Sequence, residues 1–598
     1  MLKTNRGGEM NTNYDSHKLS ENLIHAFMAY QNAFSEMAAN MADKMKAVEP
    51  DPFNLSDATR KAMQEIYVHP EKMFEHSLEL YKDYLKLMTN VAQKAAGKEI
   101  EPEFKAEGKD NRFIDEAWEN NPFFNFIKQA YYLNSAWVKD VMKECHNLDK
   151  KEIHKLDFFI KQFIDAMAPT NFPHLNPQVI KETLETNGEN IAKGAENFLK
   201  DAIRSKGNFS IATTDFKAFK VGENLAITEG KVVYQNDLMQ LIQYAPTTDK
   251  VKKVPLIMMP AWINKYYILD LKPQNSFVKW IVDKGYTVFM ISWNNPDENF
   301  KSKNFEDYMK EGPLAALKVV QEITEEKEVN FLGYCLGGTL LACTLAYLKS
   351  KKVNNIKSAT FLTTLIDFEE CGDLGVFIDE EQLSMLENRM DKRGYLDGSE
   401  MAQTFSMLRA NDMIWSFYVN NYLLGKEPFP FDILYWNADP TRLPSEMHSF
   451  YLRNMYQDNA LIKPNGISLC GQGIDLSKID LPTYVLSTRE DHIAPWKATY
   501  KATSTYKGDV RFVLSASGHV AGVVNHPSKN KYNHWVNEKY DANPDTWFNN
   551  AKEVAGSWWL DWDKWLEPKS GELVEPRKIN AKAAIEAAPG SYVKKQIV

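Results

Sequence analysis

The stretch Gly333-Tyr334-Cys335-Leu336-Gly337-Gly338 decides the fold of this chain. The apolar run 329–332 before it predicts a short buried strand, and the run 339–348 after it predicts a helix. Small residues on both sides of Cys335 permit the tight strand-to-helix turn that exposes a nucleophilic side chain. A thiol at a helix N-terminus is expected to react as a thiolate. The alternative interpretation is a glycine-rich helix start around a buried structural cysteine.

Two later strand ends supply an acid and a base. The apolar run 482–487 leads into Asp491, and the run 510–514 leads into His519. In the α/β-hydrolase fold the nucleophile, the acid and the histidine follow one another in this chain order. Taken singly, Asp491 has the ordinary interpretation of a solvated turn and His519 that of a loop histidine. Because all three strand ends agree in order, the sequence predicts a catalytic set of Cys335, Asp491 and His519.

The remaining pattern predicts an α/β fold preceded by helices. Residues 1–110 are expected to form a helical arm and linker, and residues 111–206 a helical N-terminal domain. From residue 207 to 570 strands alternate with helices, which predicts a mainly parallel catalytic sheet covered on both faces. The aromatic-rich segment 365–480 is expected to be a cap inserted over the catalytic end of that sheet. Residues 571–598 are expected to be a C-terminal tail.

The N-terminal arm carries a heptad pattern. Its apolar positions step by four and three residues: Leu23, Phe27, Tyr30, Phe34, Met37 and Met41. Such a helix packs within its own chain, pairs with a partner chain or lies on an apolar surface, and the sequence leaves the three open. The next helical block, 58–96, is expected to be interrupted at His69-Pro70, because a proline disfavours helix in the residue before it.

Composition narrows the class of protein. The 598 residues exceed one compact core, and the net charge of −9 is spread along the chain without the basic clusters that nucleic-acid binding requires. The five cysteines lack the spacing of a zinc site or a disulfide framework. No apolar run reaches the length of a membrane span, and the first twenty residues lack a signal-peptide core, so a cytoplasmic location is expected. Either Met1 or Met10 is the expected start.

Three motifs together resemble the polyhydroxyalkanoate synthases of the single-chain class I type. They are the stretch around Cys335, Glu490-Asp491-His492-Ile493-Ala494-Pro495-Trp496, and Gly518-His519-Val520-Ala521-Gly522. The similarity runs from about residue 110 to residue 565 and includes Ile263-Asn264-Lys265-Tyr266-Tyr267 and Gly556-Ser557-Trp558-Trp559. Ala261 departs from the family, which usually has a proline at that position.

This resemblance implies an acyltransferase that joins (R)-3-hydroxyacyl-CoA units, 3-hydroxybutyryl-CoA in particular, into polyester and releases CoA. Cys335 would carry the acyl group as a thioester, and His519 would transfer the proton. The backbone N–H groups of Leu336 and Ile263 would form the oxyanion hole. Asp491 would either orient His519 or activate the 3-hydroxyl of the substrate, and we expect the second, since a cysteine needs less help from a third group than a serine does.

The resemblance also implies a homodimer attached to the surface of polyester granules, with no metal or redox cofactor, no nucleic acid and no transmembrane segment. Two other functions fit the same residues. One is a cysteine-type thioesterase or lipase on the α/β-hydrolase scaffold. The other is a granule-associated scaffold protein with a vestigial site, which the intact set of Cys335, Asp491 and His519 disfavours.

Overall fold

A computed structural model describes residues 14–41, 51, 53–206, 210–577, 579 and 584–596, so Met1 and Met10 lie outside the described residues. The chain divides into two compact units. The helical unit consists of Met1–Asp215 and Gln403–Phe429, and the sheet unit consists of Phe216–Ala402 and Pro430–Val598. The second unit therefore begins at residue 216, where the sequence placed the boundary at 207.

The helical unit takes in part of the segment that was predicted to be a cap. Residues 403–429 pack among the N-terminal helices because buried asparagines hold their backbone. Asn190 donates to the carbonyl of Leu423 at 2.8 Å, and Asn197 donates to the carbonyls of Asn421 and Lys426 at 3.2 Å each. These bonds replace the hydrogen bonds that the irregular backbone of this segment would otherwise make to water.

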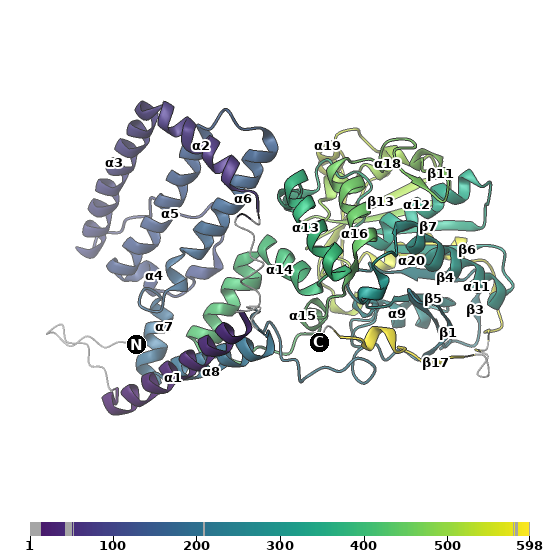
Figure 1. Cartoon of the computed structure of the whole chain (residues 1–598), viewed down its shortest axis with the longest axis horizontal. Helices are drawn as coiled ribbons and strands as arrows, with labels where there is room; N and C mark the ends of the chain where they lie inside the picture. The colour runs from purple at the N-terminus through teal and green to yellow at the C-terminus, as the bar shows by residue number, and fades with distance from the viewer. Residues whose placement is uncertain are drawn as a thin grey trace. The chain divides into compact units, whose positions relative to one another are not determined.

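The helices of the helical unit follow one another along the chain (Figure 1). They are α1 (Ser16–Met41), α2 (Ser56–Val68), α3 (Pro70–Ala95), α4 (Ala117–Asn120), α5 (Pro122–Lys143), α6 (Lys150–Ala166), α7 (Pro177–Glu185) and α8 (Glu189–Arg204). The predicted interruption at His69-Pro70 is confirmed, because α2 ends at Val68 and Pro70 is the first residue of α3. Proline suits that position, where a helix has no use for its missing N–H.

Helix α1 packs within the chain through small residues and through part of its heptad seam, since Tyr30 and Met37 contact the clusters that it forms with α8. Its buried face is formed by Ala26, Ala29 and Ala33, which lie against α8. Small side chains let two helix axes approach closely, so the alanines form the centre of the contact between α1 and α8. Of the seam, Phe27 is 69% exposed and Phe34 is 59% exposed. One side of α1 is therefore buried against α8, and large apolar side chains on the other side are exposed.

The sheet unit is built on one mixed sheet of eleven strands. In chain order they are β1 (Gly230–Gln235), β2 (Met239–Tyr244), β4 (Leu256–Met259), β5 (Val288–Trp293), β6 (Val329–Tyr334), β7 (Ile356–Leu362), β12 (Thr483–Thr488), β13 (Val510–Ser515), β14 (Asn533–Val536), β15 (Lys552–Ala555) and β17 (Glu586–Ala587). The spatial order is β15-β14-β13-β12-β7-β6-β4-β5-β2-β1-β17. From β5 to β13 all pairs are parallel, so their carboxyl ends meet at one edge.

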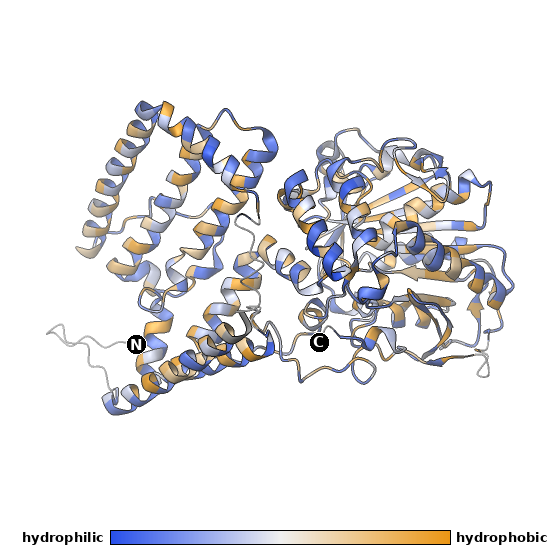
Figure 2. Cartoon of the chain, viewed as in Figure 1, coloured by the Kyte–Doolittle hydropathy of each residue, from blue (hydrophilic) through white to orange (hydrophobic). Residues whose placement is uncertain are grey.

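Helices cover both faces of this sheet, as expected for parallel strands. The helices of the unit are α9 (Phe277–Asp283), α10 (Phe305–Met309), α11 (Ala315–Thr324), α12 (Leu336–Ser350), α13 (Glu380–Arg393), α14 (Gly398–Leu408, which crosses into the helical unit), α15 (Asp432–Asn437), α16 (Ser445–Tyr451), α17 (Trp496–Thr499), α18 (Ala502–Thr505), α19 (Pro544–Asn549) and α20 (Trp559–Leu566). The strands between them carry mainly apolar residues (Figure 2).

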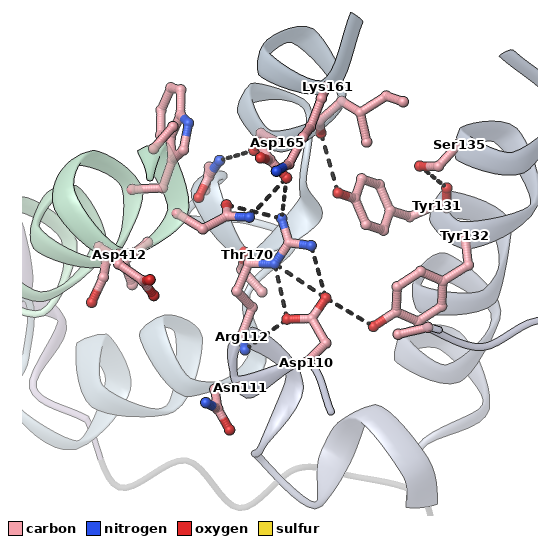
Figure 3. A pocket seen from close by; sticks show the side chains of 18 of the residues that line it. Asp110, Asn111, Arg112, Tyr131, Tyr132, Ser135, Lys161, Asp165, Thr170 and Asp412 are labelled. Carbon is pink, nitrogen blue, oxygen red and sulfur yellow. Dashed lines mark hydrogen bonds and ion pairs between the residues drawn. The ribbon is translucent and has the colours of Figure 1, made fainter. Parts of the chain in front are cut away.

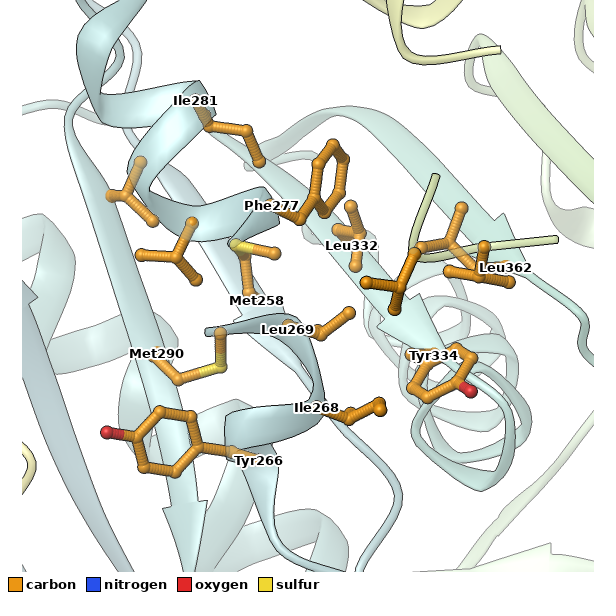
Figure 4. Packing of buried hydrophobic residues seen from close by; sticks show 14 of the residues in the cluster. Met258, Tyr266, Ile268, Leu269, Phe277, Ile281, Met290, Leu332, Tyr334 and Leu362 are labelled. Atoms are coloured by element: carbon orange, nitrogen blue, oxygen red, sulfur yellow. The ribbon is translucent and has the colours of Figure 1, made fainter. Parts of the chain in front are cut away.

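One face of the sheet packs against α9 and α20. Phe277 and Ile281 of α9 lie over one face of three neighbouring strands, at Met258 of β4, Met290 of β5 and Leu332 of β6 (Figure 4). Alternate residues of a strand share a face, which explains this selection. The tryptophans of α20 complete the layer. Trp562 is fully buried, and its indole N–H donates to Oγ1 of Thr360 in β7 at 3.0 Å.

Helices α10 and α11 are separated by a π-helical turn, Lys310–Leu314, because Pro313 lies inside it and cannot donate a helical hydrogen bond. One segment differs from the sequence prediction. The predicted tail, 571–598, is partly structural, since its strand β17 pairs with β1 at the edge of the sheet. Within the described residues, no helix is both long enough and apolar enough to cross a membrane.

Candidate active site

Cys335 lies on the turn that joins β6 to α12. Its backbone has φ 53° and ψ −120°, a conformation that is strained for a residue with a side chain. The amide of Cys335 donates to the carbonyl of Leu362 in the neighbouring strand β7 at 2.9 Å, which anchors the turn to the sheet. The side chain is partly exposed, whereas the cysteine two turns further on, Cys343, is fully buried. The structure therefore presents the Cys335 thiol at the carboxyl edge of the sheet.

The glycines around Cys335 are required by close packing. A Cβ atom on Gly333 would lie 2.5 Å from Cα of Gly338, and one on Gly337 would lie 2.2 Å from the carbonyl oxygen of Met259. A Cβ on Gly338 would collide with Thr364 at 1.9 Å. Only hydrogen fits at these three positions, so the start of α12 lies directly against the ends of β4 and β7.

Asp491 and His519 lie at the same edge of the sheet. Strands β12 and β13 run parallel with Thr488 opposite Ser515, so the loops that follow them leave the sheet side by side. Nδ1 of His519 lies 2.7 Å from Oδ2 of Asp491, and both side chains are buried. The structure thus brings together the three residues that the sequence selected.

The carboxylate of Asp491 has four donors from the protein. Its Oδ1 accepts from the backbone amides of Ile493 and Ala494 at 2.9 Å each. Its Oδ2 accepts from Oγ1 of Thr488 at 3.0 Å in addition to His519. A carboxylate has about four lone-pair directions. All of them are therefore used to hold the Asp491–His519 pair in place.

The charge state of His519 is set by its two neighbours. Burial disfavours the imidazolium, but Asp491 and Cys335 oppose it by Coulombic attraction and hydrogen bonding and raise the pKa of His519 well above its ordinary value. Tyr334 also contacts the ring: the two rings stack at 5.7 Å, and the Tyr334 hydroxyl donates to the carbonyl of His519 at 3.4 Å. The site therefore favours a protonated histidine beside the cysteine.

Two backbone amides near Cys335 are available to a ligand. Among the residues that the structure describes, no protein group accepts a hydrogen bond from the amide of Leu336 or of Ile263. Leu336 begins α12, and Ile263 belongs to the loop after β4, against which α12 is packed through Gly337. Two free donors from two adjoining segments are the arrangement that an oxyanion hole needs.

The loop that carries Ile263 is held by a buried ion pair that the sequence did not reveal. Nζ of Lys265 lies 2.9 Å from Oδ1 of Asp439 and donates to the carbonyl of Lys595 at 2.6 Å. Tyr267 donates to Oδ2 of Asp439 at 3.0 Å. Burial lowers the pKa of Lys265 and raises that of Asp439, while their mutual attraction works the other way. These partners are more than 170 positions apart in sequence, and no local pattern announces them.

A cluster of aromatic rings lies near the thiol. Trp262, Phe368 and Tyr456 pack on Tyr451, with ring centroids 5.9, 6.2 and 5.6 Å away. Burial, Tyr456 and the charge of Cys335 raise the pKa of Tyr451. Among the described residues, no group of three or more histidine, cysteine, aspartate or glutamate side chains could hold a metal ion.

A strand, a sharp turn with a cysteine, a helix, and an Asp–His pair at later strand ends define a protein of the α/β-hydrolase fold with cysteine in the nucleophile position. Residues 255–525 match the family model described as alpha/beta hydrolase fold, which confirms the predicted fold class. Residues 109–281 match the model described as Poly-beta-hydroxybutyrate polymerase (PhaC) N-terminus.

Curated relatives agree over most of the chain. The chain is 45% identical to the Poly(3-hydroxyalkanoate) polymerase subunit PhaC of Rhizobium meliloti (strain 1021), over 88% of this chain and 86% of that one. It is 44% identical to the Poly(3-hydroxyalkanoate) polymerase of Methylorubrum extorquens, over 88% and 87%. With the Cupriavidus necator protein, also a Poly(3-hydroxyalkanoate) polymerase subunit PhaC, it shares 42% identity over 81% and 83%. The chain belongs to the poly(3-hydroxyalkanoate) polymerases, a family of acyltransferases, as the sequence motifs predicted.

Proposed function

We propose that this chain polymerises (R)-3-hydroxyacyl-CoA into polyhydroxyalkanoate through an acyl thioester on Cys335. The observation that supports this most is the Cys335 turn beside the buried Asp491–His519 pair, with Nδ1 of His519 at 2.7 Å from the carboxylate. A thiolate attacks the thioester carbonyl of the substrate, the carbon–sulfur bond to CoA breaks, and CoA leaves as a thiol with a proton from His519. The amides of Leu336 and Ile263 stabilise the oxyanion.

Elongation joins two hydroxyacyl units. The 3-hydroxyl oxygen of one unit attacks the thioester carbonyl of another, an ester bond forms, and a thiol is released. His519 accepts the hydroxyl proton and returns it to the departing sulfur. Exchange between one thioester and another is nearly balanced in free energy, which suits a cysteine nucleophile. The saturated carboxylate of Asp491 supports an orienting role for this residue, in place of the hydroxyl activation that we expected from sequence.

Short acyl side chains are the proposed substrates. The rings of Trp262 and Phe368 pack on Tyr451, whose pKa is raised by burial and by the charges of Tyr456 and Cys335, and bulky rings beside the substrate would favour the 3-hydroxybutyryl group over longer ones. No cofactor enters this mechanism, because the CoA thioester brings its own activation.

The decisive experiment measures two products. The protein is mixed with (R)-3-hydroxybutyryl-CoA, released thiol is titrated, and insoluble polyester is recovered; the same assay with (R)-3-hydroxyoctanoyl-CoA tests chain length. We expect equal amounts of released CoA and polymerised units, and a slower reaction with the longer substrate. Free 3-hydroxybutyrate without polymer would show instead a thioesterase, and absence of any thiol release would favour the scaffold protein.

We further propose that the chain attaches to the surface of polyester granules in the cytoplasm through the exposed apolar residues of α1 and α3. On α3 these follow heptad spacing: Phe74, Leu78, Tyr81, Leu85 and Met88. Apolar patches of this kind usually mark a contact surface. Phe27→Ser/Phe34→Ser should lower the fraction of protein that sediments with polyester, whereas the polar change Glu21→Ser/Gln31→Ser should not. If sedimentation stays unchanged while a dimer dissociates, the surface serves a homodimer instead.

A further inference from the structure

The ion pair of Lys265 and Asp439 in the sheet unit is buried more deeply than the charged network of the helical unit. Its side chains are only 2% and 8% exposed. In the helical unit, Arg112 donates to Asp110 at 2.7 Å and to Asp165 at 3.2 Å beside a cavity, and the Arg112 side chain is 20% exposed (Figure 3). Desolvation of two charges offsets most of their attraction in a buried pair. The Lys265–Asp439 pair is therefore better explained by the position that it fixes than by added stability.

The loop after β4 is bound through its carbonyl groups by Trp436 and Thr441, two residues of the aromatic-rich insertion. The carbonyl of Trp262 accepts from Oγ1 of Thr441 at 2.5 Å, and the carbonyl of Ile263 accepts from the amide of Thr441 at 3.1 Å. The carbonyl of Lys265 accepts from the indole N–H of Trp436 at 2.7 Å. The insertion thus holds three carbonyls of this loop and leaves the amide of Ile263 available to a ligand.

The two ends of this loop are fixed by packing. After Lys265 the chain enters the 3-10 turn Tyr266–Leu269, whose side chains are buried in the core of the sheet unit (Figure 4). At the other end, the carbonyl oxygen of Pro260 would lie only 2.7 Å from a Cβ atom on Gly337 of α12. Residues 261–265 between these ends belong to no helix or strand. The position of the loop between its two fixed ends therefore depends on the cross-link that Lys265 makes.

The ammonium of Lys265 joins the loop to two segments that are distant in sequence. Its Nζ lies 2.9 Å from Oδ1 of Asp439 in the insertion and donates to the carbonyl of Lys595 near the C-terminus at 2.6 Å. Tyr267 also donates to Asp439, at Oδ2 and 3.0 Å. Asn295, which follows β5, also donates to the carbonyl of Lys595, at 3.2 Å. Because each acceptor is held by a second donor, the ammonium is fixed in place, and the backbone of its own residue with it.

We propose that Lys265 is a positioning residue of the oxyanion hole. Its ion pair with Asp439 keeps the loop where the amide of Ile263 and the amide of Leu336 meet one carbonyl oxygen. Such donors must lie about 2.7–3.1 Å from the oxyanion, and a misplacement of about 1 Å can cost about 10²-fold in rate. The inference rests on the proposed acylation of Cys335 and adds to it a residue that acts through the amide of Ile263.

Lys265→Met tests this role, because methionine keeps an unbranched apolar stem and removes the ammonium. Burial already raises the pKa of Asp439, so its carboxyl can take up a proton in the variant and the fold should tolerate the change. In single turnovers with an acyl-CoA that lacks the 3-hydroxyl, we expect the acylation rate at saturating substrate to fall about 10- to 100-fold, below the loss of about 10²- to 10³-fold for a whole donor. The substrate concentration at half-saturation should change less than threefold.

Lys252→Met is the matched control. This lysine is also buried and pairs with Glu567 at 2.8 Å, but it precedes β4, whose other end carries the loop. The control should keep the acylation rate within twofold of the unmodified protein.

A second reaction of the same thiol separates positioning from general damage to the site. Alkylation of Cys335 by iodoacetamide displaces iodide from a saturated carbon and forms no oxyanion. Its rate in Lys265→Met, followed by mass spectrometry of the Cys335 peptide, should therefore stay within twofold. Asp439→Asn keeps an acceptor for Tyr267 and should reproduce the slower acylation. The double variant should be no slower than the slower single variant, because both changes break one pair.

Two results would overturn the proposal: equal slowing of alkylation and acylation in Lys265→Met, or unchanged acylation in both single variants. Either result is read in protein that still acylates Cys335, so it leaves the proposed function standing. Thiol release that survives Cys335→Ala would instead refute the proposed function itself.

Discussion

Replacing Asp491 by asparagine tests the orienting role most directly. The side chain keeps its size, but one of its two oxygen atoms becomes an NH2 group. Facing His519, that group opposes the Nδ1–H donor; turned around, it opposes the amides of Ile493 and Ala494, which now donate to Oδ1 at 2.9 Å. Either orientation leaves buried donors face to face, and the first one also favours the wrong tautomer of His519.

The magnitude follows from the geometry. Breaking a buried charge pair by removing one partner costs about 3–5 kcal/mol, and each 1.36 kcal/mol in activation free energy is a factor of ten. If the orienting contact persists in the transition state, acylation of Cys335 should slow about 10²- to 10⁴-fold. The loss of the carboxylate also removes the main attraction that raises the pKa of His519, so this pKa should fall in the variant.

The assay is a single turnover with an acyl-CoA that lacks the 3-hydroxyl, which can acylate Cys335 but cannot elongate. Thiol release gives the acylation rate, and nuclear magnetic resonance of the His519 ring gives its pKa. Asp541→Asn, the same chemical change in an exposed loop, serves as the control and should leave the rate unchanged. An acylation rate within threefold of the unmodified protein, together with lost elongation, would refute the orienting role and return Asp491 to the substrate hydroxyl.

Three further outcomes are expected. Cys335→Ala should abolish thiol release, whereas Cys343→Ala should keep it, since Cys343 is buried in α12 and burial raises its pKa to about 12; equal losses would place the nucleophile elsewhere. Trp562→Phe should lower the free energy of unfolding in urea by about 1–3 kcal/mol, because Oγ1 of Thr360 loses its donor, and adding Thr360→Val should restore part of it. Gly337→Ala should slow acylation by displacing α12 from the carbonyl of Met259, now at 2.2 Å from the added Cβ; unchanged kinetics would show that the turn can adjust.

The sequence was sufficient for the parts of the fold that local pattern controls. Buried parallel strands read as short apolar runs, and the residues after them are ordered along the chain, so the positions of Cys335, Asp491 and His519 at one sheet edge could be predicted. The break before Pro70 depends only on the chemistry of one residue and its neighbour.

The features that could not be predicted from the sequence depend on packing between segments far apart in the chain. The seam of α1 was expected from its large apolar residues, but Ala29 and Ala33 made the closer contact with α8, which depends on the shape of the partner helix. Residues 403–429 were assigned to a cap, although Asn190 and Asn197, more than 220 positions earlier, hold them in the helical unit. No local sequence pattern in either segment indicates these long-range partners.

The raised pKa of His519 orders the steps of the proposed reaction. An imidazolium beside Cys335 cannot accept a proton from a substrate hydroxyl, because it already holds one. It can give that proton to a departing thiolate, since the thiol that forms has an ordinary pKa of about 8.5. In the proposed reaction, release of CoA as a thiol takes this proton and leaves the imidazole neutral. Only then can His519 take the proton of the 3-hydroxyl, which ties each elongation step to the departure of a thiol from the site.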